Sequence, residues 1–125
     1  MAAQPRRIIV GFDATEGARR ALDAAAQLTG YGSTLAVISV TGDDERDAPD
    51  PLAEARERLL KQLVAATYVR RVGDPADEIV AAASELDADL IVVGRRGGED
   101  SRRPAPGSVS ADIVRRAACN VLVVG

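Results

Sequence analysis

The chain has 125 residues, of which 46% are hydrophobic and 28% charged, and its formal net charge is −3. This length suits one compact domain over residues 1–125, whose core must be aliphatic because only 2% of the residues are aromatic. The weak net charge gives no indication of a nucleic-acid partner, and no apolar run is long enough to span a membrane, so we expect neither partner.

Five short segments rich in β-branched residues predict strands, and the apolar run Leu90 to Val93 predicts a buried parallel one. They lie at residues 7–12, 34–40, 68–72, 89–93 and 121–124. Between them, apolar residues recur at helical spacing, and each of these segments follows a residue that can begin a helix. The predicted helices begin after Thr15, Asp50, Asp74 and Gly107, and they extend to Gly30, about Ala66, Leu86 and Ala118.

The helical spacing also predicts which side chains face the core. They are Ala18, Ala21, Leu22, Ala25 and Leu28, then Leu52, Ala55, Leu59, Leu60 and Leu63, then Ile79, Ala82, Ala83 and Leu86, and finally Val109, Ile113, Val114 and Ala117. The alternation of strands and helices predicts an α/β fold in three layers, with a doubly wound, five-stranded parallel sheet and helices on both faces. Ligands of such sheets bind beyond the carboxyl ends of the strands, where the strand order reverses.

The stretch after the fourth strand carries the clearest functional signal. Gly94 and Gly97 follow the apolar run, and Gly107 and Ser108 stand at the start of the last helix. Glycine allows tight turns and close approach of a ligand, and the free N–H groups of a helix start attract phosphate. A plain loop with a serine N-cap explains the same residues, so local chemistry leaves both interpretations open. Residues 90–125 carry a net charge of +3 and the rest of the chain −6, which favours the phosphate interpretation.

The spacing Gly94-x2-Gly97-x9-Gly107-Ser108 resembles the nucleotide-binding signature of the universal stress protein family. The resemblance extends to both ends of the chain and implies a Rossmann-like sheet of strand order 3-2-1-4-5, with strands 1 and 4 at the switch point. It implies a stress-response protein that binds ATP, or ADP or AMP, as a regulatory ligand, with Mg²⁺ as the expected companion of the nucleotide. It also implies a homodimer joined through the last strand, whose apolar edge would otherwise be exposed.

The resemblance assigns ligand contacts to individual residues. The expected nucleotide-binding set is Phe12, Asp13, Val40, Val93, Gly94, Arg96, Gly97, Gly107, Ser108, Val109 and Ser110. In this set Asp13 would form a hydrogen bond to the ribose or the adenine, and the backbone of Val40 would face the adenine edge. Taken alone, Asp13 also suits an ordinary turn ahead of a helix. Residues 98–106 read GEDSRRPAP, where relatives often carry apolar residues, and this difference bears on affinity.

The sequence offers little for catalysis. Histidine, the commonest general base, is absent, and the one lysine, Lys61, follows no glycine-rich loop. We therefore expect no catalytic residue and no dedicated metal ligand, so a binding protein is expected rather than an efficient enzyme. The alternatives are a weak ATPase or phosphotransferase, and a nucleotide-free dimerisation or adaptor module of the same fold. The single cysteine, Cys119, and the lack of an apolar signal segment predict a cytoplasmic protein.

Overall fold

The computed structural model describes residues 5–42, 49–95 and 108–125. The strands of these segments are β1 (Arg7–Gly11), β2 (Thr34–Thr41), β3 (Thr67–Val72), β4 (Leu90–Gly94) and β5 (Asn120–Val124). The helices are α1 (Glu16–Leu28), α2 (Pro51–Lys61), α3 (Pro75–Glu85) and α4 (Ser108–Arg116). Every predicted element is confirmed, and the strand ends differ from the predicted ones by a single residue.

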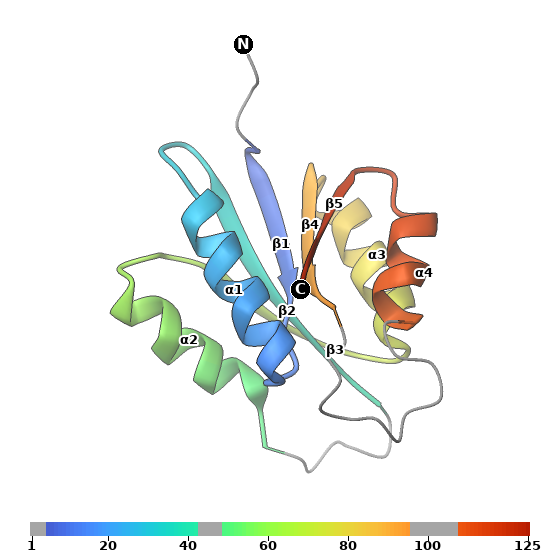
Figure 1. Cartoon of the computed structure of the whole chain (residues 1–125), viewed down its shortest axis with the longest axis horizontal. Helices are drawn as coiled ribbons and strands as arrows, with labels where there is room; N and C mark the ends of the chain where they lie inside the picture. Colours follow the sequence, from blue (N-terminus) through green and yellow to red (C-terminus); the bar gives the residue numbers. More distant parts are fainter. Residues whose placement is uncertain (1–4, 43–48, 96–107) are drawn as a thin grey trace.

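Within the described residues the strands form one parallel sheet in the order β3-β2-β1-β4-β5. Helices α1 and α2 cover one face of this sheet, and α3 and α4 cover the other (Figure 1). This is the predicted three-layer, doubly wound α/β fold, and the strand order is the one that the resemblance implied. All the strands therefore end at the same edge of the sheet, as parallel strands must.

The core has two parts, one on each face of the sheet. Alternation along β1 sends Ile8 and Val10 toward α1 and α2, and it sends Ile9 toward α3 and α4. Each of these side chains is at most 1% exposed, and burial of one such side chain contributes roughly 1.5–3 kcal/mol. The face of α1 that meets the sheet is rich in alanine, which lets the helix backbone come close to the strands.

The starts of the helices follow the predicted capping pattern. Thr15 caps α1, since its Oγ1 accepts a hydrogen bond from the N–H of Ala18 at 3.2 Å. Asp50 and Asp74 cap α2 and α3 with their carboxylates, and each is followed by proline at the first helical position. Local sequence therefore determines where α1, α2 and α3 begin.

The predicted end of α2 is wrong, because the helix stops at Lys61 and not near Ala66. The reason is Leu63, which has a φ of 60°, in the left-handed region. The N–H of Val64 then bonds back to the carbonyl of Leu59 at 3.0 Å, a pattern that terminates helices. Glycine normally occupies the left-handed position, and leucine there carries no recognisable stop signal.

The predicted buried faces are confirmed along the middle of the helices and wrong at five positions. The exposed side chains among those predicted to be buried are Leu28, Leu60, Leu63, Leu86 and Val114. Leu28 ends α1, Leu86 caps the end of α3, and Leu63 lies beyond the end of α2. Leu60 and Val114 each follow a fully buried residue of their helix, so they are turned away from the sheet.

No helix in the described ranges is both long enough and apolar enough to cross a membrane.

Candidate functional site

The switch point lies at the carboxyl end of β1, the central strand of the sheet, which pairs with β2 on one side and β4 on the other. Its partners run parallel to it, with Gly11 opposite Ile38 of β2 and Val10 opposite Val92 of β4. The chain passes from β1 into α1 on one face, whereas α3, on the other face, leads into β4. The loop after β1 and the turn after β4 therefore share one edge of the sheet, as a ligand site of this fold requires.

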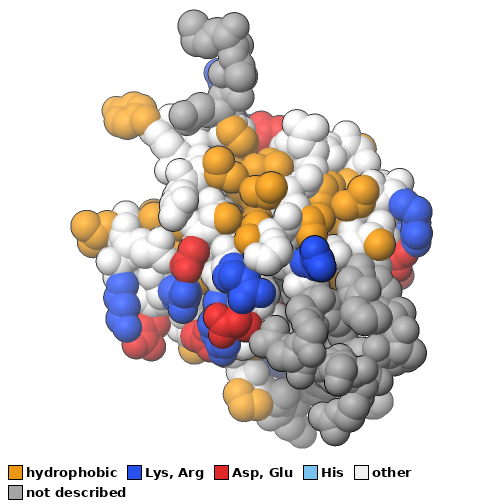
Figure 2. Space-filling view, viewed as in Figure 1, with side chains coloured by type: hydrophobic (Ala, Val, Ile, Leu, Met, Phe, Trp, Pro, Cys, Tyr) orange, Lys and Arg blue, Asp and Glu red, His pale blue; other side chains and the backbone are white. Residues whose placement is uncertain are grey.

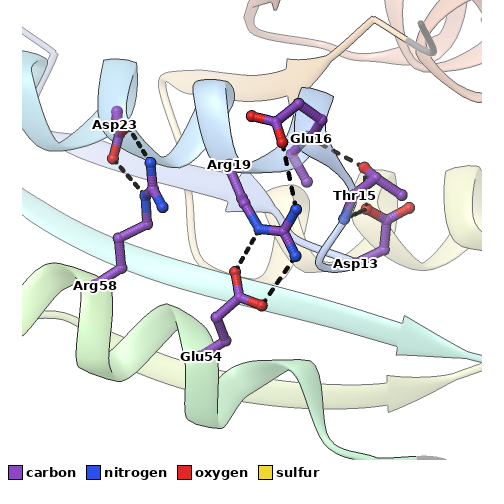
Figure 3. A network of polar contacts seen from close by, with 8 residues as sticks. Asp13, Thr15, Glu16, Arg19, Asp23, Glu54 and Arg58 are labelled. Atoms are coloured by element: carbon purple, nitrogen blue, oxygen red, sulfur yellow. Dashed lines mark hydrogen bonds and ion pairs between the residues drawn. The ribbon is translucent and has the colours of Figure 1, made fainter. Parts of the chain in front are cut away.

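The loop after β1 holds Asp13 in a defined orientation. Phe12 is 3% exposed, and its N–H bonds to the carbonyl of Ile38 at 2.9 Å, which fixes the start of the loop. The Oδ1 atom of Asp13 accepts the hydroxyl of Thr15 at 2.6 Å and its N–H at 3.2 Å (Figure 3). Ala14 between them takes a φ of 62°. Within the described residues these bonds leave Oδ2 of the exposed Asp13 without a partner, so this oxygen can meet a ligand.

The backbone of Val40 faces the same switch point. Along β2 the carbonyl of Ile38 points toward β1, where it accepts from Phe12, and the carbonyl of Thr41 points toward β3, where it accepts from Gly73. Because the direction alternates from residue to residue, the N–H and C=O of Val40 point toward β1. Since β1 has ended at Gly11, they lie beyond its last residue. The side chain of Val40 is half-buried against the α3 and α4 face of the sheet.

Gly94 ends β4 in direct contact with the first turn of α1. A Cβ atom placed on Gly94 would lie 2.4 Å from the carbonyl carbon and oxygen of Gly17. A Cβ atom on Gly17 would in turn lie 2.7 Å from the carbonyl oxygen of Arg95. Backbone meets backbone here, so the packing alone requires glycine at 94, whether or not a ligand binds. Val93, just before it, is 5% exposed and belongs to the core on the α3 and α4 face.

The other predicted contacts belong to the segment between β4 and α4 and to the start of that helix. Outside the described residues lie Arg96, Gly97 and Gly107, together with the charged segment 98–106. Helix α4 begins at Ser108, as predicted. Val109 is half-buried, and Ser110 is only 7% exposed. The structure thus brings Asp13, Val40 and Gly94 to one edge, and the ligand contacts assigned to all these residues stay predictions.

Sequence reasoning missed two features of the site. One is Gly17, which lies inside the first turn of a helix, where glycine is unfavourable, and that misfit was an available signal. The other is a set of ion pairs between α1 and α2, which local spacing cannot reveal because the partners are 35 residues apart. In the part of the chain that the structure describes, no cluster of acidic or cysteine side chains could hold a metal ion.

Comparison with known proteins decides the family. A sequence profile of the universal stress protein family matches residues 5–125. The chain belongs to the universal stress protein family. Universal stress protein Rv1636 of Mycobacterium tuberculosis is 31% identical over 139 residues, and the match covers 95% of each protein.

Two solved universal stress proteins resemble the whole described fold. One, solved in complex with cAMP, is 27% identical with a TM-score of 0.79, and the match covers 98% of this chain and 99% of that one. The other, from Archaeoglobus fulgidus in complex with dAMP, is 25% identical with a TM-score of 0.73. The match covers 98% of this chain and 100% of that one. Both of these proteins were therefore solved with an adenine nucleotide.

Proposed function

We propose that this universal stress protein binds an adenine nucleotide at the switch point beside β1, as a regulatory ligand, in the cytoplasm. The observation that carries the proposal is that the Val40 backbone and the Asp13 carboxylate lie at the same edge of the sheet. An adjacent N–H and C=O are complementary to adenine, which offers a ring-nitrogen acceptor beside its amino donor. A carboxylate oxygen is a suitable acceptor for ribose hydroxyls.

The nucleotides in the two solved relatives support this choice of base. Both cAMP and dAMP carry adenine, and neither is a triphosphate. We propose ATP as the ligand of this chain, with Mg²⁺ accompanying it, because a basic excess lies in residues 90–125, next to the expected phosphates. The start of α4 would supply N–H groups to the phosphate chain.

The same site gives no support to efficient catalysis, so we propose a binding protein and not an enzyme. The sequence contains no histidine, and the Thr15 hydroxyl that Asp13 accepts is held in place as the cap of α1, where it accepts the N–H of Ala18. Slow ATP hydrolysis is the alternative. A turnover assay with Mg²⁺ and saturating ATP tests it, and phosphate release well above the spontaneous rate would favour an ATPase.

A nucleotide-free adaptor of the same fold is the second candidate, and one observation favours it. Gly94 is explained by its contact with Gly17, so this residue of the signature is needed even without a ligand. An adaptor would keep Gly94 and the fold while binding nothing at Asp13 and Val40. The two candidates therefore differ in one measurable property, which is occupancy by nucleotide.

We also propose a homodimer through β5. In the described sheet β5 pairs with β4 alone, so its other edge is open. Leu122 and Val123 of this strand are 37% and 36% exposed, and Val114 of α4 is 53% exposed. Figure 2 shows hydrophobic side chains gathered on the part of this face where β5 and α4 lie in Figure 1. An apolar edge strand of this kind is normally covered, and a second copy would cover it.

Mass spectrometry of the supernatant from denatured, purified protein tests the proposed function. We expect an adenine nucleotide at a substantial fraction of the protein concentration, and much less from Asp13→Asn. The variant keeps an Oδ1 acceptor for Thr15, so its loop should stay intact. If wild-type protein carries no nucleotide and binds none that is added, the adaptor interpretation replaces this one.

A further inference from the structure

Helices α1 and α2 lie side by side on one face and are joined by two ion pairs of opposite polarity (Figure 3). In the first, Arg19 of α1 donates from Nε and Nη2 to the two carboxylate oxygens of Glu54 of α2, at 2.7 and 3.1 Å. In the second, Arg58 of α2 donates from Nε and Nη2 to those of Asp23 of α1, at 2.9 and 2.8 Å. Both ion pairs are bidentate, so each one restricts the relative orientation of its two side chains.

The two pairs place the helices in register. Arg19 and Glu54 are each the fourth residue of their helix, and Asp23 and Arg58 are each the eighth. A shift of α2 by one turn would bring Glu54 toward Asp23, or Arg58 toward Arg19, and either contact joins like charges. The alternating polarity therefore favours one alignment of the two helices and disfavours its neighbours.

The first pair lies about one turn from the starts of α1 and α2. The N–H of Arg19 bonds to the carbonyl of Thr15 at 2.9 Å, and Thr15 is the residue that holds Asp13. The Nη1 atom of Arg19 also lies 3.5 Å from a carboxylate oxygen of Glu16. Glu54 stands in the first turn of α2, the helix that follows β2 and hence Val40 along the chain. One contact thus links the elements that follow β1 and β2.

We propose that Arg19 and Glu54 are positioning residues for the nucleotide site, which hold the Asp13 loop and the start of α2 at the separation that the nucleotide requires. This inference rests on the proposed function. Neither side chain is assigned a contact with the ligand. They act by restricting how the Asp13 loop and the start of α2 move relative to each other, which lowers the cost of ordering them on binding.

The second pair is a matched control supplied by the chain itself. It has the same arginine–carboxylate bonding and nearly the same exposure, with side chains 39% and 36% exposed against 31% and 40% in the first pair, and its Asp23 also accepts from Nε2 of Gln62 at 2.9 Å. Hydrogen bonding to Arg58 lowers the pKa of Asp23, as hydrogen bonding to Arg19 lowers the pKa of Glu54. The Asp23–Arg58 pair differs in lying one turn farther from the helix starts, so it should support the helices without positioning the site.

The first measurement is calorimetric titration of ATP into Arg19→Gln, Glu54→Gln and the double variant, with Arg58→Gln as the control. We expect each single variant to weaken affinity by roughly three- to tenfold, a typical size for coupling through packed elements. The double variant should bind ATP no more weakly than the weaker-binding of the two single variants, because both substitutions break the same contact. Arg58→Gln should lose about as much stability as Arg19→Gln does, while its affinity for ATP stays that of wild type. Equal affinity in Arg19→Gln and wild type, or an equal loss in Arg58→Gln, would overturn the inference.

The second measurement is hydrogen exchange without nucleotide, followed over residues 13–19. Arg19→Gln should speed exchange of these amides several-fold, and Arg58→Gln should leave them unchanged. If wild-type protein binds no nucleotide, the proposed function fails, and this comparison alone decides whether the pair positions the Asp13 loop. The same exchange rates in both variants would show that it does not.

Discussion

Gly94 at the end of β4 lies against the backbone of Gly17, so closely that a Cβ atom on Gly94 would come within 2.4 Å of the Gly17 carbonyl. Gly94→Ala should therefore lower the free energy of unfolding by about 1–3 kcal/mol, the usual cost of overpacking. Chemical denaturation measures the change. Gly125→Ala is the control, since a Cβ atom there meets nothing within 4 Å. A variant at 94 as stable as wild type would show that α1 shifts easily, and that the signature glycine serves the ligand alone.

Leu63 offers the opposite test, because the native backbone disfavours the residue that is present. It takes a φ of 60°, and its side chain is 93% exposed. Leu63→Gly should raise the free energy of unfolding by about 1 kcal/mol. Leu60→Gly, at a 64% exposed position inside α2, should lower it by about 1 kcal/mol. The midpoint temperature of thermal unfolding should rise in Leu63→Gly and fall in Leu60→Gly. A shift in the same direction for both variants would contradict a left-handed backbone at residue 63.

The secondary structure was largely predictable from the sequence. Strand runs, capping residues and helical spacing were enough for every element and for the middle of each buried face. The end of α2 was mispredicted because Leu63 occupies a position where glycine is the usual signal. The order of the strands came from the resemblance to a family, since alternation alone is compatible with more than one order.

The site was predictable only in part, for a geometric reason. Asp13 could be found from its place after a strand, and Gly94 from its place at a turn. That the N–H and C=O of Val40 extend past the end of β1 depends on the register of β1 and β2, which no local pattern contains. The contact between Gly17 and Gly94 likewise joins residues that are distant in the chain.

The Asp23–Arg58 ion pair should make stability depend on pH. Hydrogen bonding to Arg58 lowers the pKa of Asp23 below its ordinary value of 3.8. The folded protein then releases this proton at a lower pH than the unfolded chain does. The stabilisation is therefore complete above the unfolded pKa and is lost as the pH falls through the folded one.

Comparison with Asp23→Asn isolates this contribution. At neutral pH wild type should be more stable by less than about 1 kcal/mol, because both side chains are more than one third exposed and solvent screens the pair. The difference should shrink toward zero as the pH falls below 3.8. Denaturation curves of both proteins across this range provide the measurement, and a difference that is indifferent to pH would contradict the ion pair.

The open edge of β5 predicts the oligomeric state. Val123→Lys should convert the proposed dimer to a monomer, because a charge on an exposed edge strand opposes pairing with another copy. Leu63→Lys, at the far more exposed end of α2, should leave the dimer intact. Light scattering at micromolar protein concentration distinguishes the two masses. Wild-type protein that is already a monomer, or a Leu63→Lys variant that also dissociates, would count against β5 as the interface.

Calorimetric titration of wild-type protein with ATP is the most direct test of nucleotide binding at the switch point. We predict saturable binding near one nucleotide per chain, weaker binding of GTP, and a sharp loss in Gly97→Val with a cooperative fold retained. Gly97 lies outside the described residues, so that part of the prediction comes from the signature spacing alone. No saturable heat from a fully folded wild-type sample, with ATP, AMP or cAMP, would contradict the proposed function.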